Sequence, residues 1–79
     1  MEQIEIVTET IKAILEDETL PKQIVATLNR ILEILNGPDE TGLKKDKCIH
    51  QLEDVDANSN IEAGIRVQLL DVASAIEQL

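Results

Sequence analysis

The sequence contains no phenylalanine, tyrosine or tryptophan, and only seven lysine and arginine residues against sixteen aspartate and glutamate residues. The formal net charge of −9 repels phosphate backbones. Without aromatic rings the chain also cannot stack nucleotide bases. Both shortages argue against nucleic acid as a partner.

Cysteine and long apolar runs are equally scarce. A single cysteine, Cys48, excludes an intramolecular disulfide framework. No apolar run approaches the roughly 18 residues of a membrane helix, and the N-terminus lacks the basic region of a signal peptide. We therefore expect a cytoplasmic protein with no membrane partner, folded as one domain over residues 1–79.

The residues that are present predict an aliphatic, all-helical core. Eleven isoleucines, ten leucines and five valines supply it. They recur at spacings of three and four, which places them on helix faces. The four expected stripes are Ile4, Val7, Ile11, Ile14 and Leu15; Ile24, Leu28, Ile31 and Leu35; Leu43, Cys48, Ile49, Leu52 and Val55; and Ile61, Ile65, Leu69, Val72 and Ile76.

Turn and cap residues set the expected helix ends. Thr19 is the predicted N-cap of the second helix, and Gly37 suits a left-handed residue after its end. We expect loops at 38–42 and 54–60. Ser59 and Glu62 fit a capping box that opens the fourth helix, which then runs to Leu79.

The two halves of the chain are alike. At an offset of 41 residues, eleven apolar residues coincide, where chance predicts about seven. We therefore predict a four-helix up-and-down bundle built from two similar helical hairpins, at residues 1–37 and 42–79.

The fourth helix has a second apolar face. Ala63, Val67, Leu70 and Ser74 recur opposite the main stripe, and a helix that is apolar on two sides needs two partners. We predict that Ala63, Val67 and Leu70 contact a second copy of the chain or another protein. The alternative is a central position for this helix.

The segment 54–62 suggests a second kind of site. Its oxygen-bearing side chains alternate as in an EF-hand loop and would serve a divalent cation such as calcium. The glycine and the final glutamate that such loops require are replaced by Ser59 and Ile65. The alternative ligand set is Asp54, Asp56, Asn58, Asn60 and Glu62.

No pattern indicates an enzyme or a bound cofactor. Cys48 and His50 are two residues apart, so they point about 200° from each other on a helix and cannot form a nucleophile–base pair. We therefore expect a non-catalytic interaction module.

The segment Leu15–Ile24, with its acidic–Thr–x–Pro turn, resembles an archaeal family of uncharacterised proteins numbered zero-one-four-seven. The related turn in the second half is 56–62, followed by Arg66. This sequence has Glu62 where the family usually has proline, and it lacks the family's aromatic residue in the last helix. The resemblance implies an all-helical bundle in an archaeal cytosol and carries no assigned activity.

Overall fold

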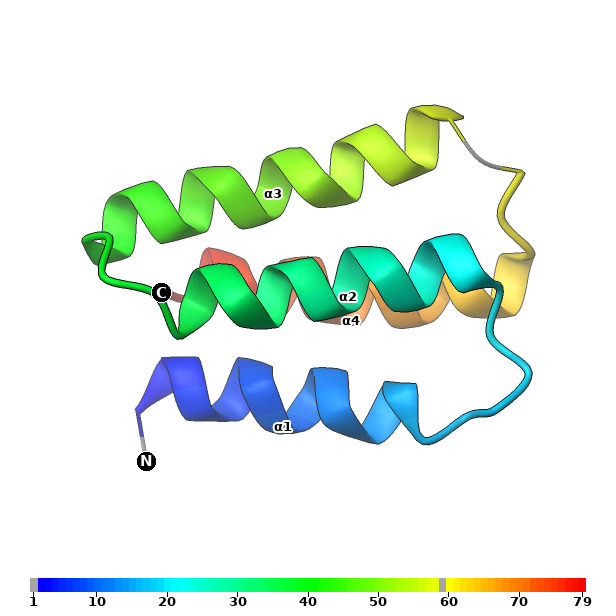
Figure 1. Ribbon diagram of the computed structural model, residues 1–79, viewed down its shortest axis with the longest axis horizontal. Coiled ribbons are helices and arrows are strands. Elements are labelled where there is room, and N and C mark those ends of the chain that lie inside the picture. Colours follow the sequence, from blue (N-terminus) through cyan, green and yellow to red (C-terminus); the bar gives the residue numbers. More distant parts are fainter. Residues whose placement is uncertain (1, 59) are drawn as a thin grey trace.

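The structure, a computed structural model, describes residues 2–58 and 60–79. Its helices are α1 (Gln3–Leu15), α2 (Lys22–Leu35), α3 (Thr41–Asn58) and α4 (Ala63–Glu77), and no strand occurs in these ranges (Figure 1). The predicted all-α fold class is confirmed.

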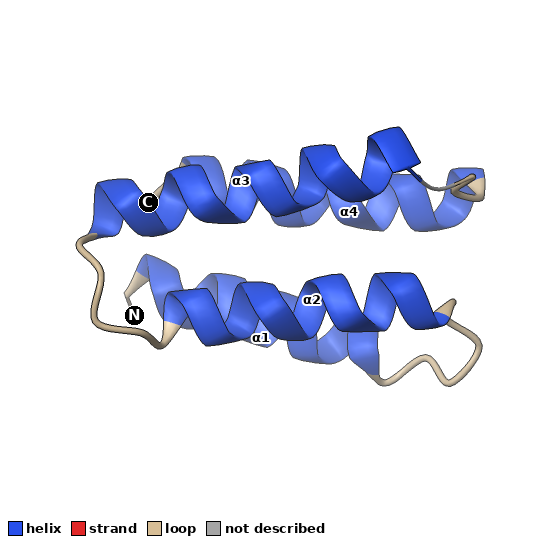
Figure 2. Cartoon of the chain, turned by 45° about the horizontal axis from the view of Figure 1, so that its top comes forward, coloured by secondary structure: helices blue, strands red, loops and turns tan. Residues whose placement is uncertain are grey.

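The four helices form a closed ring. The connections between them are six, five and four residues long, which makes consecutive helices antiparallel neighbours. Helix α1 packs against α2 and α4, and α3 packs against the same two helices. Figure 2 shows the resulting layers, α1 beside α2 and α3 beside α4. This is the predicted up-and-down bundle, with both termini at one end (Figure 1).

Most of the predicted stripe residues form the core. All four stripe residues of α2 are buried, as are Val7, Ile11 and Ile14 of α1. No polar side chain is buried among the described residues. Each buried Leu, Ile or Val stabilises the fold by about 1.5–3 kcal/mol. Packing rather than intrinsic helix propensity therefore holds these short helices.

Burial follows the internal repeat. Shifting α2 by 41 residues gives 63–76, which lies within α4. Six pairs at this offset are buried at both positions: Val7/Cys48, Ile11/Leu52, Ile14/Val55, Leu28/Leu69, Ile31/Val72 and Leu35/Ile76. The hairpins differ at one end, where Leu20 and Ile24 are buried but Ile61 and Ile65 only half-buried.

The predicted caps of α2 are wrong. The helix begins at Lys22 after Pro21, and the backbone N and Oγ1 of Thr19 donate to Asp17 Oδ1, at 2.9 and 2.6 Å. Thr19 therefore closes a turn before the helix. None of the three glycines has a positive φ. Instead, the N–H of Gly37 donates to the carbonyl of Ile34 at 3.1 Å, in a tightened last turn.

The predicted ends of α3 are also wrong. It begins at Thr41, inside the expected loop 38–42, and continues to Asn58, through most of the expected loop 54–60. Burial of Val55 anchors the added turn, and Asn58 Nδ2 donates to the carbonyl of Asp54 at 2.9 Å. Leu43, an expected core residue, is 42% exposed.

Helix α4 begins two residues later than its stripe predicts. Glu62 is the N-cap, with an extended backbone and no side-chain cap hydrogen bond. Ser59, the other half of the predicted capping box, lies outside the described residues. Because Glu62 precedes the first turn, it cannot act as the third residue of that turn, and the helix ends at Glu77 rather than Leu79.

Candidate functional site

The outer face of α4 is an apolar surface. The helix occupies a corner of the ring, between α1 and α3, rather than the centre of the bundle. Its core stripe points inward, so the opposite face points to solvent. Ala63 is exposed there, and Val67 and Leu70 are 59% and 61% exposed. The alternative that burial within the chain explains this face is therefore wrong.

Helix α2 provides an internal comparison for this face. At the 41-residue offset, the exposed residues that correspond to Ala63, Val67, Leu70 and Ser74 are Lys22, Ala26, Asn29 and Glu33. Two helices with the same role in the fold thus differ in their outward faces. The fold does not require large apolar side chains at these positions.

A groove of about 270 Å³ runs beside this face, between α3 and α4. Its apolar lining comes from Ile49, Leu52, Leu69, Leu70 and Ala73. Its charged lining comes from Glu53, Asp56, Arg66 and Glu77. Leu70 therefore belongs both to the exposed face of α4 and to the wall of the groove.

The repeat identifies side chains that fill the matching position between α1 and α2. Leu32, the counterpart of Ala73, is half-buried against the core. Leu15 and Val25, the counterparts of Asp56 and Arg66, pack there in the same way. In the second hairpin, the smaller Ala73 leaves the groove open, and Asp56 and Arg66 place charges on its wall.

Arg66 and Asp56 form an ion pair across the groove. Arg66 Nη1 donates to Asp56 Oδ1, which joins the start of α4 to the end of α3. Both side chains remain about half exposed, so the pair adds little stability. The sequence analysis assigned no role to Arg66 or Ala73. The replacement of Leu32 by the smaller Ala73 at the repeat offset was the signal in the sequence that could have indicated the groove.

The proposed cation ligands do not converge. Asp54, Asp56 and Asn58 lie on α3 rather than in a loop, so Asp56 points away from the other two. Asn58 Nδ2 donates to Asp54 Oδ1 at 3.0 Å, and Asp56 is paired with Arg66. Asn60 and Glu62 follow in the connection. Within residues 2–58 and 60–79, no three His, Cys, Asp or Glu side chains are grouped so as to hold a metal ion.

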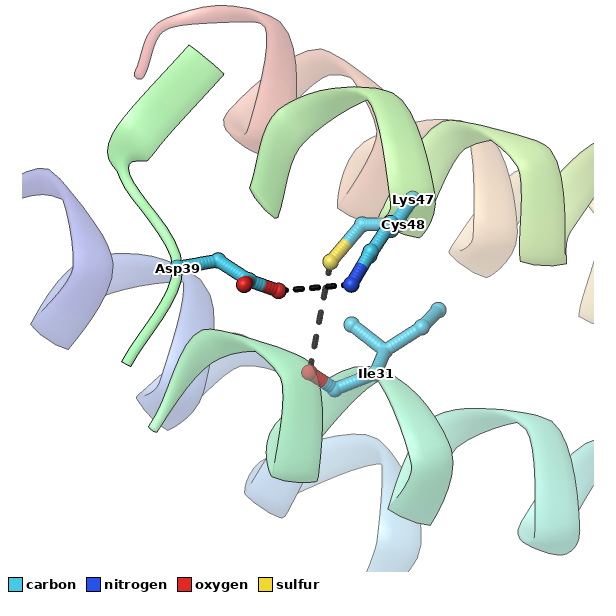
Figure 3. A network of polar contacts seen from close by, with 4 residues as sticks. All are labelled: Ile31, Asp39, Lys47 and Cys48. Carbon is cyan, nitrogen blue, oxygen red and sulfur yellow. Dashed lines mark hydrogen bonds and ion pairs between the residues drawn. The ribbon is translucent and has the colours of Figure 1, made fainter. Parts of the chain in front are cut away.

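The thiol and the imidazole lie apart, as the sequence predicts. Cys48 is fully buried, and its Sγ lies 4.0 Å from the carbonyl oxygen of Ile31 (Figure 3). Burial raises the pKa of the Cys48 thiol to about 11, an effect that the positive charge of Lys44 partly offsets. His50 is exposed. The protonated, enclosed thiol is a core side chain rather than a nucleophile.

Lys47 is part of a surface ion pair. Its Nζ lies 2.7 Å from Asp39 Oδ2, and the pair links the first turns of α3 to the preceding connection (Figure 3).

In the described part of the chain, no helix is long and apolar enough to cross a membrane.

Comparison with known proteins gives the relationship of the chain. The model of the uncharacterised protein family UPF0147 matches residues 1–79. A UPF0147 protein of Archaeoglobus fulgidus is 32% identical over 76 residues, which cover 96% of this chain and 87% of the relative. No solved structure matches the chain. The chain belongs to the uncharacterised protein family UPF0147.

Proposed function

We propose that the protein is a non-catalytic interaction module that self-associates through the outer face of α4, where Ala63, Val67 and Leu70 are the contact residues. The exposure of Val67 and Leu70, 59% and 61%, is the observation that carries the proposal. Ala26 and Asn29 at the matching positions of α2 support it. They show that the fold does not need large apolar side chains there, so the apolar face of α4 calls for another explanation. Exposed apolar patches of this kind are typical of interaction sites.

The distribution of charge favours contact along the sides of the bundle. All seven basic residues lie in the helices, together with nine of the acidic residues. The other seven acidic residues lie outside the helices, towards the two ends of the bundle. The helical sides therefore carry a small net charge, and repulsion between copies is concentrated at the ends.

The experiment is sedimentation of the wild-type chain over a wide concentration range, beside Val67→Asp and Leu70→Asp. We expect a concentration-dependent dimer for the wild type and monomers for both variants, because a carboxylate in an apolar contact is costly. Circular dichroism should show unchanged helix content, since both positions are exposed.

Matched controls come from the first hairpin. Ala26→Asp and Asn29→Asp place the same charge at the corresponding exposed positions of α2 and should leave dimerisation intact. A wild-type chain that remains monomeric at millimolar concentration would contradict the proposal. Equal loss of the dimer in the α2 variants would show that charge alone, and not the α4 face, is responsible.

A further inference from the structure

We infer that two copies pair through antiparallel α4 helices, so that Arg66 of each binds Glu77 of the other and Leu70 packs on Ala73. This inference rests on the proposed self-association. It shares Leu70 with the face proposed above, shifts the centre of the contact towards the groove, and places Ala63 and Val67 at the edge of the contact. The four residues are four, three and four positions apart, so they form one stripe on α4. All four also line the groove between α3 and α4.

The stripe is self-complementary in one orientation only. Its midpoint lies between Leu70 and Ala73, so a two-fold axis there, perpendicular to α4, places Arg66 opposite Glu77 of the second copy. The same axis places Leu70 opposite Ala73. A parallel, in-register pair would instead set Arg66 against Arg66 and Glu77 against Glu77. Charge therefore selects the antiparallel arrangement.

Side-chain size supports the same register. Leu70 is 61% exposed, whereas Ala73 leaves the groove open where Leu32 fills the corresponding space in the first hairpin. In the antiparallel pair, Leu70 of one copy enters the space beside Ala73 of the other, and the two-fold axis repeats the contact. Ala73→Leu, which restores the side chain of the first hairpin, should therefore block pairing and preserve the fold.

Arg66 has the capacity for a second carboxylate. One of its nitrogens donates to Asp56 of its own chain, and a guanidinium carries five N–H donors. Its side chain is 48% exposed, so other donors are available to a second copy. Arg66 would then bridge Asp56 of its own chain and Glu77 of the second copy, at both ends of the contact.

The predicted contact is small. A stable interface buries about 800 Å² per partner, which is about one sixth of the 5097 Å² surface of this chain. The stripe spans about 16 Å of helix. We therefore expect a weak dimer that forms and dissociates rapidly, and whose charged pairs decide its orientation.

Charge reversal tests the pairing. Arg66→Glu and Glu77→Arg should each weaken the dimer by roughly tenfold, because each creates two like-charged contacts. The double variant Arg66→Glu/Glu77→Arg should recover most of the affinity. Thermal unfolding of each variant controls for the lost contact with Asp56. Failure of the double variant to recover would overturn the inference.

Cysteine cross-linking tests the orientation directly, in a Cys48→Ala background. In the antiparallel pair, residues 66 and 77 of different copies are close, while residue 77 lies about 16 Å along the helix from its own counterpart. A mixture of Arg66→Cys and Glu77→Cys chains should therefore form a disulfide-linked dimer, and Glu77→Cys alone should not.

The two proposals fail in different ways. A dimer that cross-links through Glu77→Cys alone would overturn the antiparallel register and leave self-association standing. A monomeric wild-type chain under the same conditions would overturn both.

Discussion

At the scale of single residues, Cys48 shows how the core sets chemistry. Burial holds its pKa at about 11, against an ordinary value of 9.0. Unfolding exposes the thiol, so between these values the unfolded chain releases a proton that the folded chain keeps. The free energy of unfolding should therefore decline from about pH 9 to pH 11 because of this thiol. Near neutral pH the thiol is protonated in both the folded and the unfolded chain, so its ionisation does not make the free energy of unfolding depend on pH there.

Urea unfolding across this range measures the effect. Other groups also titrate there, so Cys48→Ala is the necessary reference. The difference in unfolding free energy between the wild type and this variant should shrink as the pH rises. A constant difference would show that the thiol ionises equally in both states.

At the scale of elements, the sequence predicted helix faces better than helix ends. Stripe residues such as Leu28 and Val72 are specified by spacing and then locked by packing. Ends depend on short-range competition that spacing does not report. Thr19 bonded to Asp17 instead of capping α2, and burial of Val55 extended α3 through an acidic segment.

The exposed face and the groove were predicted to different degrees. Spacing alone identified Val67 and Leu70 as a second stripe. It could not show that α4 lies at a corner of the ring, because that depends on how α1 closes against α4. The groove depends on Ala73 being smaller than Leu32, a difference that matters only once both residues are known to occupy equivalent positions.

The extension of α3 bears on the calcium hypothesis. Asp54, Asp56 and Asn58 are held on a helix, and Asp56 is already paired with Arg66. Binding a cation there would require unwinding the last turn of α3. We therefore expect the thermal midpoint to be the same in excess EDTA and in millimolar calcium. A calcium-dependent rise would show that the segment rearranges into a binding loop, and magnesium at equal ionic strength controls for screening.

At the scale of the whole molecule, the ring of helices has no unique starting point. Both termini lie at the end of the bundle that also holds the connection from α2 to α3 (Figure 1). Helices α4 and α1 are packed neighbours, just as α2 and α3 are. The gap between the end of α4 and the start of α1 therefore occupies the same place in the second half of the repeat as the five-residue connection 36–40 occupies in the first.

This symmetry predicts a tolerated circular permutation. A chain that opens between Pro38 and Asp39 and joins residue 79 to residue 1 has four residues between α4 and α1, and one added glycine makes five. All four helix contacts of the ring would persist, and among the ion pairs of the described residues the 2.7 Å pair of Lys47 with Asp39 stands at the new ends. We expect unchanged helix content and a loss of about 1 kcal/mol or less, since that pair is exposed.

Opening the chain inside α3 instead, between Cys48 and Ile49, is the control. It interrupts a helix whose Cys48, Leu52 and Val55 are buried together, so it should unfold the protein. Chemical denaturation of both permutants compares the two cases. If the first permutant also fails to fold, the order of the hairpins matters as well as their shared pattern.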